Sequence, residues 1–267
     1  MIIKSLSGLT RYSLIAINDS DDNETVSRIT LAAAAHEIEG DIVSRRANDL
    51  SDTNPDPEID NSVVYTEGHS EVTASFLGDT AYLKGWTHLG ASTTEAVADT
   101  STLDLTFSDG ARWEMVSSNP DTLGTTPTAR LSTLTLNKGH VYVGTTQEDF
   151  NYPSTLFADS ASVLGSTTAP ATLDVNTLSG KGDFYLRARL ADNTDASDRV
   201  HVREDATGSF TLHVKSSGNA AAPTEQTGYL VEVGNPQTSA TFTLVNNQPV
   251  ELGLYKYTLA TRNSTTR

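Results

Sequence analysis

From Val63 onward, apolar and polar residues alternate with a period of two. The clearest run spans residues 184–190, where Phe184, Leu186 and Ala188 alternate with more polar side chains. Because successive side chains of a β-strand point to opposite faces, this alternation is typical of half-buried strands. About seven such short runs lie between residues 173 and 259, separated by turn-forming residues, which is the pattern of a β-sandwich or jelly roll.

Two turn signals favour antiparallel pairing of these strands. Asp109-Gly110 lies between alternating runs at 103–107 and 111–115, and Asn137-Lys138-Gly139 lies between two further runs. Each signal predicts a hairpin, because glycine accepts the positive φ that tight hairpin turns require. No fixed-period repeat is apparent in the sequence.

The segment from Asp22 to Gly40 has a different pattern, which predicts a helix. Asp22 is a candidate N-cap, Glu24 falls in the first turn, and the alanine run 32–35 has high helix propensity. We therefore expect a mainly β chain of antiparallel β-sandwich or jelly-roll-like domains with a short N-terminal helical arm. The predicted domains are an N-terminal arm with one helix and an acidic linker (1–61), a first β domain (62–152) and a C-terminal β-sandwich domain (153–267).

The charge balance excludes one class of function. The chain has 34 acidic and 18 basic residues and a net charge of −16, whereas a nucleic-acid binder neutralises phosphates with clustered Lys and Arg. No apolar stretch is long enough for a membrane-inserted helix. With no cysteine, disulfides and thiolate metal sites are excluded. The N-terminus lacks a basic region followed by a small-residue cleavage site, so we expect no secretion signal.

Calcium is the one cofactor for which the sequence offers candidate ligands. Asp52, Asn54 and Asp56 place oxygen atoms at alternate positions, like the start of an EF-hand loop. Pro57 replaces the required turn glycine, and Val63 stands where a bidentate Glu should close the shell, so a solvated acidic linker is the favoured interpretation. A similar but weaker acidic pattern contains Asp192 and Asp195.

Catalytic motifs are absent from the sequence. None of the six histidines belongs to an HExxH motif, and residues 68–72 lack the second glycine of a nucleophile elbow. We therefore expect a protein that is not an enzyme and has no cofactor, with calcium as the alternative. Among the aromatic residues, the candidates for an exposed contact are Tyr255, Tyr257 and Trp86.

The chain combines an apolar N-terminal arm, short Thr- and Ser-rich strands and an absence of cysteine. In this combination it resembles the accessory structural proteins of tailed viruses, of the capsid decoration, turret or tail-fibre type. The resemblance implies a non-enzymatic virion protein that forms a homo-oligomer, commonly a trimer. It also implies docking on other virion proteins and contact with host glycans. The residues expected to mediate assembly are Ile2, Ile3, Leu6, Tyr12 and Ile15.

Two other functions remain open on the sequence alone. An aromatic row on a sandwich face would suit a carbohydrate-binding or carbohydrate-active β-sandwich protein. Acidic loops that bind calcium would instead suit a calcium-dependent adhesin domain, with the acidic residues named above as ligands.

Overall fold

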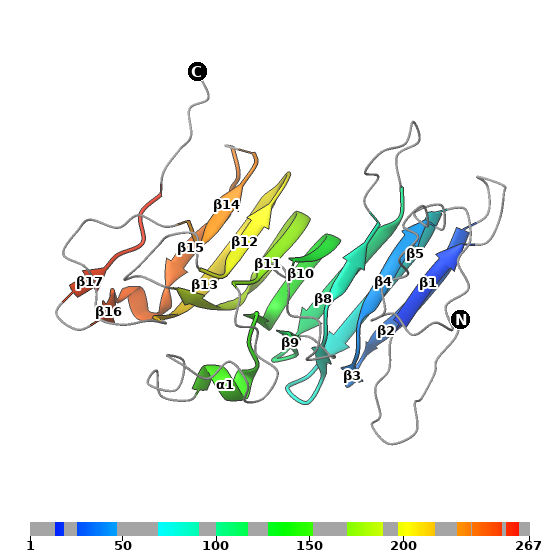
Figure 1. The fold of residues 1–267 in the computed structure, drawn as a ribbon, viewed down its shortest axis with the longest axis horizontal. Helices are drawn as coiled ribbons and strands as arrows, with labels where there is room; N and C mark the ends of the chain where they lie inside the picture. The colour runs from blue at the N-terminus through cyan, green and yellow to red at the C-terminus, as the bar shows by residue number, and fades with distance from the viewer. Residues whose placement is uncertain are drawn as a thin grey trace.

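A computed structural model describes residues 14–18, 26–46, 69–90, 100–116, 128–151, 170–188, 197–216, 229–235, 237–252 and 255–261. Within these ranges the chain is mainly β, and α1 (Gln147–Asn151) is the one α-helix. The strands follow one another in sequence order along the long axis of the molecule, from blue to red in Figure 1. Every strand pair is parallel except the C-terminal hairpin of β16 (Val250–Leu252) and β17 (Tyr255–Tyr257).

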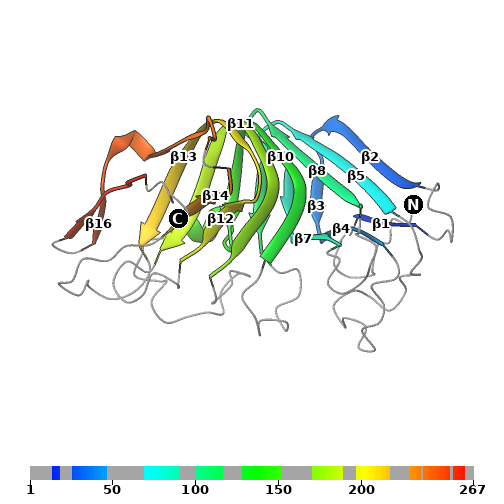
Figure 2. The same ribbon diagram turned by 90° about the horizontal axis from the view of Figure 1, so that it is seen from above.

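The parallel strands form three strips, and the chain passes from strip to strip so that each circuit is a coil stacked on the previous one (Figure 2). The first strip contains β2 (Val26–Ala34), β5 (His69–Leu77), β8 (Thr102–Ser108), the first halves of β10 (Thr128–Val143) and β11 (Thr172–Ala188), β12 (Arg199–Val202), the start of β13 (Ala206–Ser216) and β14 (Val231–Val233). The second strip contains β3 (Glu37–Glu39), β6 (Tyr82–Lys84), β9 (Arg112–Met115), the second halves of β10, β11 and β13, and β15 (Thr241–Leu244). The third strip contains β1 (Leu14–Asn18), β4 (Ile42–Arg46) and β7 (Thr87–Leu89). A 3-10 turn, η5 (Val245–Asn247), follows β15.

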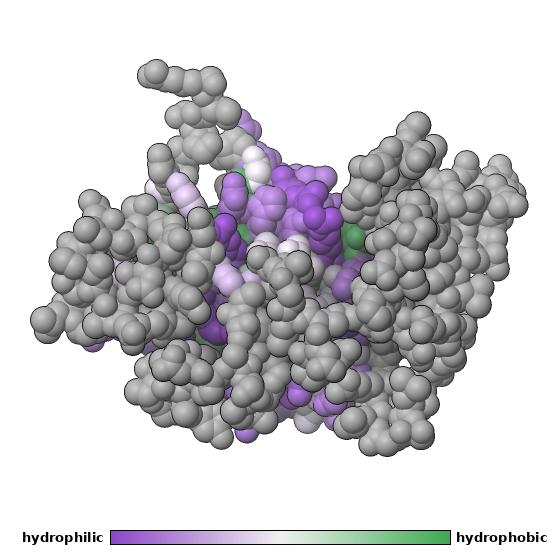
Figure 3. Space-filling model, in the orientation of Figure 1, coloured by the Kyte–Doolittle hydropathy of each residue, from purple (hydrophilic) through white to green (hydrophobic). Residues whose placement is uncertain are grey.

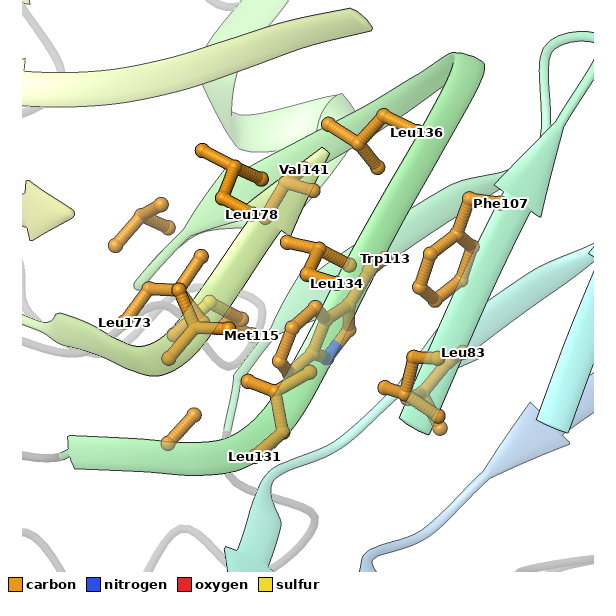
Figure 4. Packing of buried hydrophobic residues seen from close by; sticks show 14 of the residues in the cluster. Leu83, Phe107, Trp113, Met115, Leu131, Leu134, Leu136, Val141, Leu173 and Leu178 are labelled. Carbon is orange, nitrogen blue, oxygen red and sulfur yellow. The ribbon is translucent and has the colours of Figure 1, made fainter. Parts of the chain in front are cut away.

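Inward-facing apolar side chains form rows that run from coil to coil. The row of the second strip consists of Ile38, Leu83, Trp113, Val141, Phe184, Leu212 and Leu244, each in register with the next. Its members from Leu83 to Leu212 have no exposed surface, and Figure 4 shows Leu83, Trp113 and Val141 gathered in the interior. Full burial of one such side chain stabilises a fold by roughly 1.5–3 kcal/mol. The row therefore joins the coils into one structure.

The predicted antiparallel sandwich is wrong, because the strands pair in parallel between coils. The alternation of apolar and polar residues is real, but here it separates the inside of a coil from its outside. The two predicted hairpins are also wrong. Asp109 and Gly110, with φ of 51° and 91°, turn the chain from the first strip to the second, and the Gly110 N–H donates to the Lys138 carbonyl of the next coil at 3.0 Å. At Lys138, whose φ is 64°, β10 bends between the same two strips without ending.

The predicted N-terminal helix is wrong as well. Residues 26–34 and 37–39 form β2 and β3 instead. Ile29 pairs in register with Val72 of β5 and is buried, so tertiary pairing overrides the helix propensity of the alanine run. No helix in the described part of the chain has the length and apolar character that a membrane crossing requires.

Most of the buried apolar residues from Ile29 to Leu212 form a single cluster. It contains residues from all three predicted segments of the chain, including Ile42, Phe107 and Phe184. The division of the chain into three domains stays a prediction.

Candidate functional site

The outward side chains of the second strip form two rows of polar and aromatic residues. In the first row, Arg112 of β9 is in register with His140 of β10, which is in register with Asp183 of β11. The second row consists of Glu114, Tyr142, Tyr185 and His213. Adjacent strands lie about 4.8 Å apart, so side chains in such rows contact their neighbours in the next coil. Parallel stacking thus brings together residues that are distant in the sequence.

Asp183 lies between two imidazole rings, an arrangement that we call the carboxylate clamp. His140 Nδ1 lies 3.2 Å from Asp183 Oδ2, and His213 Nε2 is hydrogen-bonded to Asp183 Oδ1 at 3.2 Å. The three side chains are between 25 and 30 % exposed. Burial opposes ionisation of Asp183, but the two imidazoles outweigh burial and hold its pKa below the ordinary value of 3.8. The clamp therefore favours the carboxylate form and connects β10, β11 and β13.

Aromatic rings stack beside the clamp. The ring centroids of Tyr142 and Tyr185 are 4.1 Å apart, those of Tyr185 and His213 are 4.3 Å apart, and both pairs are within 14° of parallel. We call these three residues the ring column. Burial raises the pKa of the Tyr142 hydroxyl, and the nearby Tyr185 adds to this effect. Burial also raises the pKa of Tyr185, to which the charge of Asp183 contributes. The two tyrosines of the column are therefore packed and neutral.

The helix α1 covers part of the ring column. Phe150 meets Tyr185 edge-on, with centroids 5.2 Å apart, and the Lys215 amine lies 5.2 Å from the centre of the Phe150 ring. The same amine donates a hydrogen bond to the Phe150 carbonyl. At the start of α1, the Gln147 N–H donates to Glu114 Oε1 at 3.2 Å. Residues from β9, β10, β11 and β13 thus hold this helix in place.

A second carboxylate, Asp174, is enclosed on the first strip. Arg203 donates to both of its oxygens, at 2.8 and 2.5 Å, and His201 Nδ1 lies 3.0 Å and Arg130 Nε 3.3 Å from it. Burial opposes ionisation of Asp174, but Arg203, His201 and Arg130 together lower its pKa. Figure 3 shows a strongly hydrophilic area over this part of the sheet, near β10 to β12.

The chemistry of both carboxylates follows from these contacts. Each one is engaged by cationic or hydrogen-bonding side chains of its own chain, which suits a crosslink between coils better than proton transfer to a substrate. Among the described residues, no group of three or more His, Asp or Glu side chains is placed to hold a metal ion.

The structure places only some of the sequence-predicted site residues. The assembly residues Ile2, Ile3, Leu6 and Tyr12 and the calcium candidates Asp52, Asn54, Asp56, Asp192 and Asp195 lie outside the described residues. Ile15 belongs to β1, and Tyr255 and Tyr257 belong to β17. Trp86, a candidate surface contact, is buried against the core with 7 % exposure. The roles of these residues and the cofactor expectation stay predictions.

Sequence reasoning did not find the clamp or the ring column. One signal for them exists, because residues 139–143 (GHVYV) and 182–186 (GDFYL) share the order glycine, polar, apolar, tyrosine, apolar. This similarity places His140 beside Asp183 and Tyr142 beside Tyr185 if the two segments pair in parallel.

Comparisons with known proteins give this fold a family context. The family model described as Pertactin matches residues 131–266. The "Probable autotransporter YpjA" of Escherichia coli (strain K12) is 34 % identical over 164 residues, which are 60 % of this chain and 9 % of that protein. The "IgA-specific serine endopeptidase autotransporter" of Neisseria gonorrhoeae is 33 % identical over 115 residues, 43 % of this chain and 7 % of that protein. The "Immunoglobulin A1 protease autotransporter" of Haemophilus influenzae is 32 % identical over 136 residues, 51 % of this chain and 7 % of that protein.

These similarities overturn the resemblance to tailed-virus proteins. The relatives are bacterial autotransporters, so the inferred roles in capsid decoration or tail fibres, the virion location and the virion partners are wrong. The trimer was inferred from the same resemblance and has no other support. The carbohydrate-binding alternative relied on a sandwich fold, which the parallel coil replaces. The relatives support neither this alternative nor the calcium-dependent adhesin domain. Two of the relatives carry protease or endopeptidase names, and the chain spans less than a tenth of their length.

Proposed function

Because the chain belongs to the pertactin family, we propose that it is a shaft segment in the exported part of a bacterial autotransporter. By shaft we mean a stack of parallel coils that spaces and presents other parts of the protein. The observation that carries the proposal is the row of buried residues from Leu83 to Leu212, which passes through successive coils.

A stack of this kind suits a spacing role for a physical reason. Each coil contacts mainly the coils before and after it, so length grows with the number of coils and the core grows with it. The crosslinks on the outer surface, Asp183 with its two imidazoles and Asp174 with its two arginines, add contacts between neighbouring coils.

We also propose that this segment contributes no catalytic residue of its own. The similarity to the two relatives named as proteases covers 7 % of each. The carboxylates Asp174 and Asp183 are already paired within the chain. The test is incubation of the purified chain with immunoglobulin A1 and with casein, for which we expect no cleavage. Cleavage that is lost on a single Asp or His substitution would overturn this part of the proposal.

The location can be tested on intact cells. Antibodies raised against the 267-residue chain should label unpermeabilised cells of the source bacterium, and added protease should remove the label. A cytoplasmic protein, detected only after lysis, is the control. Labelling that requires lysis would contradict an exported shaft.

A further inference from the structure

The carboxylate clamp contains two groups that change charge near neutral pH. His140 and His213 lie on either side of Asp183, in the coils before and after it, with nitrogen–oxygen distances of 3.2 Å on both sides. Histidine is the side chain whose ordinary titration falls between pH 5 and 8. The strength of a contact across three coils therefore depends on the proton concentration.

We propose that His140, Asp183 and His213 form a proton-responsive fastening that holds neighbouring coils together more tightly in a mildly acidic medium. The imidazole of His213 gives the carboxylate an ordinary hydrogen bond, whereas His140 Nδ1 lies 3.2 Å from it without the geometry of a hydrogen bond. A protonated imidazole adds the attraction of opposite charges, and charge-assisted hydrogen bonds are roughly twice as strong as neutral ones. This inference does not depend on where the protein is displayed.

The geometry limits how many protons the clamp takes up easily. The first proton leaves the three groups neutral as a set, whereas the second gives them a net positive charge. The two imidazoles face one carboxylate, so a proton on one of them reduces what the other gains from Asp183. The first proton therefore strengthens the clamp more than the second.

Other charged and titratable groups on the surrounding elements modify this response. Arg112 of β9, which is in register with His140, opposes the second proton, and Glu114 of the same strand favours it. Tyr185 stacks on His213 and stays neutral in this pH range. The remaining ionisable groups on β11, β13 and α1 near these positions are Lys181, Arg187, Lys215, Glu148 and Asp149.

The stability of the full 267-residue chain tests the proposal. Urea unfolding is measured at pH 7.5 and 5.5 for the wild type and for the double variant His140→Gln, His213→Gln. The folded-to-unfolded ratio is compared between the wild type and the variant at each pH. When the pH is lowered from 7.5 to 5.5, the wild-type ratio divided by the variant ratio should rise about tenfold, the scale of a hydrogen bond to a charged group. The pairs His88–Asp41 and His201–Asp174 remain in both proteins, so the difference isolates the clamp.

His36 provides a matched control. Its Nε2 lies 2.7 Å from the Ala32 carbonyl of the preceding strand and is not placed on a carboxylate in the described contacts. The variant His36→Gln should therefore keep the pH response of the wild type. A wild-type-to-double-variant ratio that is the same at both pH values would overturn the proposal.

A second measurement keeps the proposal testable if the double variant does not fold. In proton NMR of the histidine rings, Asp183→Asn should change the pH dependence of the His140 and His213 signals. The pH dependence of the His36 signals should be the same in both proteins. His140 and His213 signals whose pH dependence is unchanged by Asp183→Asn would contradict the clamp.

Discussion

Two buried hydroxyl groups in strands of the third strip differ in their hydrogen bonding. Ser44 has no exposed surface, and its Oγ donates to the Thr102 carbonyl at 2.7 Å and lies 2.9 Å from Ser70 Oγ. Thr87 is equally buried, but its Oγ1 has no hydrogen-bond partner among the residues that the structure describes. A buried polar group without a partner costs free energy that a bonded one does not.

Replacing this unpartnered hydroxyl should therefore stabilise the protein. Thr87→Val keeps the shape of the side chain and removes the buried oxygen, so we expect the free energy of unfolding to rise by about 1 kcal/mol. Urea unfolding at pH 7 measures the change. Ser44→Ala is the matched control and should lower the free energy of unfolding, because it leaves the partners of the Ser44 hydroxyl unsatisfied. Loss of stability in Thr87→Val would indicate that the Thr87 hydroxyl does have a partner.

Acid should destabilise the protein through two carboxylates with lowered pKa values, Asp174 and Asp183. The pKa values of Asp174 and Asp183 are lower in the folded state than their ordinary value of 3.8. Their contribution to stability is therefore present above that value and is lost as the pH falls below it toward the folded pKa.

A single substitution isolates the Asp183 part of this acid dependence. Asp183→Asn should lower the free energy of unfolding at pH 6 and flatten its decline between pH 5 and 2. Urea midpoints across this range provide the measurement. Asp109→Asn is the control. The Asp109 side chain is 63 % exposed, and its oxygen lies 3.7 Å from the Lys138 amine, so this exposed ion pair contributes little to stability. The substitution should leave the acid profile unchanged. Identical acid profiles in wild type and Asp183→Asn would argue against the pKa assignment.

At the scale of elements, α1 depends on tertiary contacts for its stability. It has five residues, fewer than an isolated helix needs to be stable in water. Its Phe150 ring contacts Tyr142, Tyr185 and the Lys215 amine. The helix is therefore expected to form only when it is docked on the ring column.

Truncation of this ring should release the helix. Phe150→Ala should lower the free energy of unfolding by about 2–3 kcal/mol, less than a fully enclosed phenylalanine would, because the ring covers an outer surface. Hydrogen exchange should become faster in α1 and remain slow in the inner rows of β10 and β11. Glu148→Ala, at an exposed position of the same helix, should change neither. Equal exchange in both variants would contradict the docking of α1 through Phe150.

Individual strands and turns show which parts of the fold the sequence could predict. Period-two alternation located strands such as β8 and β13, because inward and outward positions alternate in any strand with one buried face. It could not distinguish parallel from antiparallel pairing, which depends on which segments become neighbours. Likewise, Asp109-Gly110 correctly indicated a turn, but the partner of the following strand is β10 of the next coil.

A recurring separation of about 30 residues in the core row was the missed signal for the coil. Leu83 and Trp113 are 30 residues apart, Trp113 and Val141 28, Phe184 and Leu212 28, and Leu212 and Leu244 32. Between Val141 and Phe184 the separation is larger, because α1 and residues 152–170 intervene, and this hides the period. The clamp could not be found without this register, since His140, Asp183 and His213 meet only through the pairing of β10, β11 and β13.

At the scale of the whole molecule, neighbouring coils approach closely at positions that require glycine. A Cβ atom added at Gly182 would lie 2.6 Å from the Gly139 carbonyl oxygen and 2.8 Å from Leu136 Cβ. Backbone atoms cannot move away without separating two coils. A methyl group at this position would therefore act on the stack as a whole.

Gly182→Ala should reduce the stability of the entire shaft. We expect a lower urea midpoint together with faster hydrogen exchange in both β10 and β11, since the added methyl separates their pairing in the middle of the stack. Gly78→Ala is the control. Gly78 lies in a turn with φ of 95°, and no atom lies within 4 Å of a methyl group added there. Only local backbone strain should therefore result. Exchange that stays unchanged in β10 and β11 of Gly182→Ala would contradict close stacking at this position.

The pairing of β10 with β11 extends from Thr128↔Thr172 to Tyr142↔Tyr185, although 28 residues separate the end of β10 from the start of β11. The pairing of the two strands therefore does not require a short connection, and this connection can vary in length or composition while the strands stay aligned. Natural variation, or the insertion of a foreign peptide by design, could therefore change the connection between β10 and β11 while the stack of parallel coils stays intact.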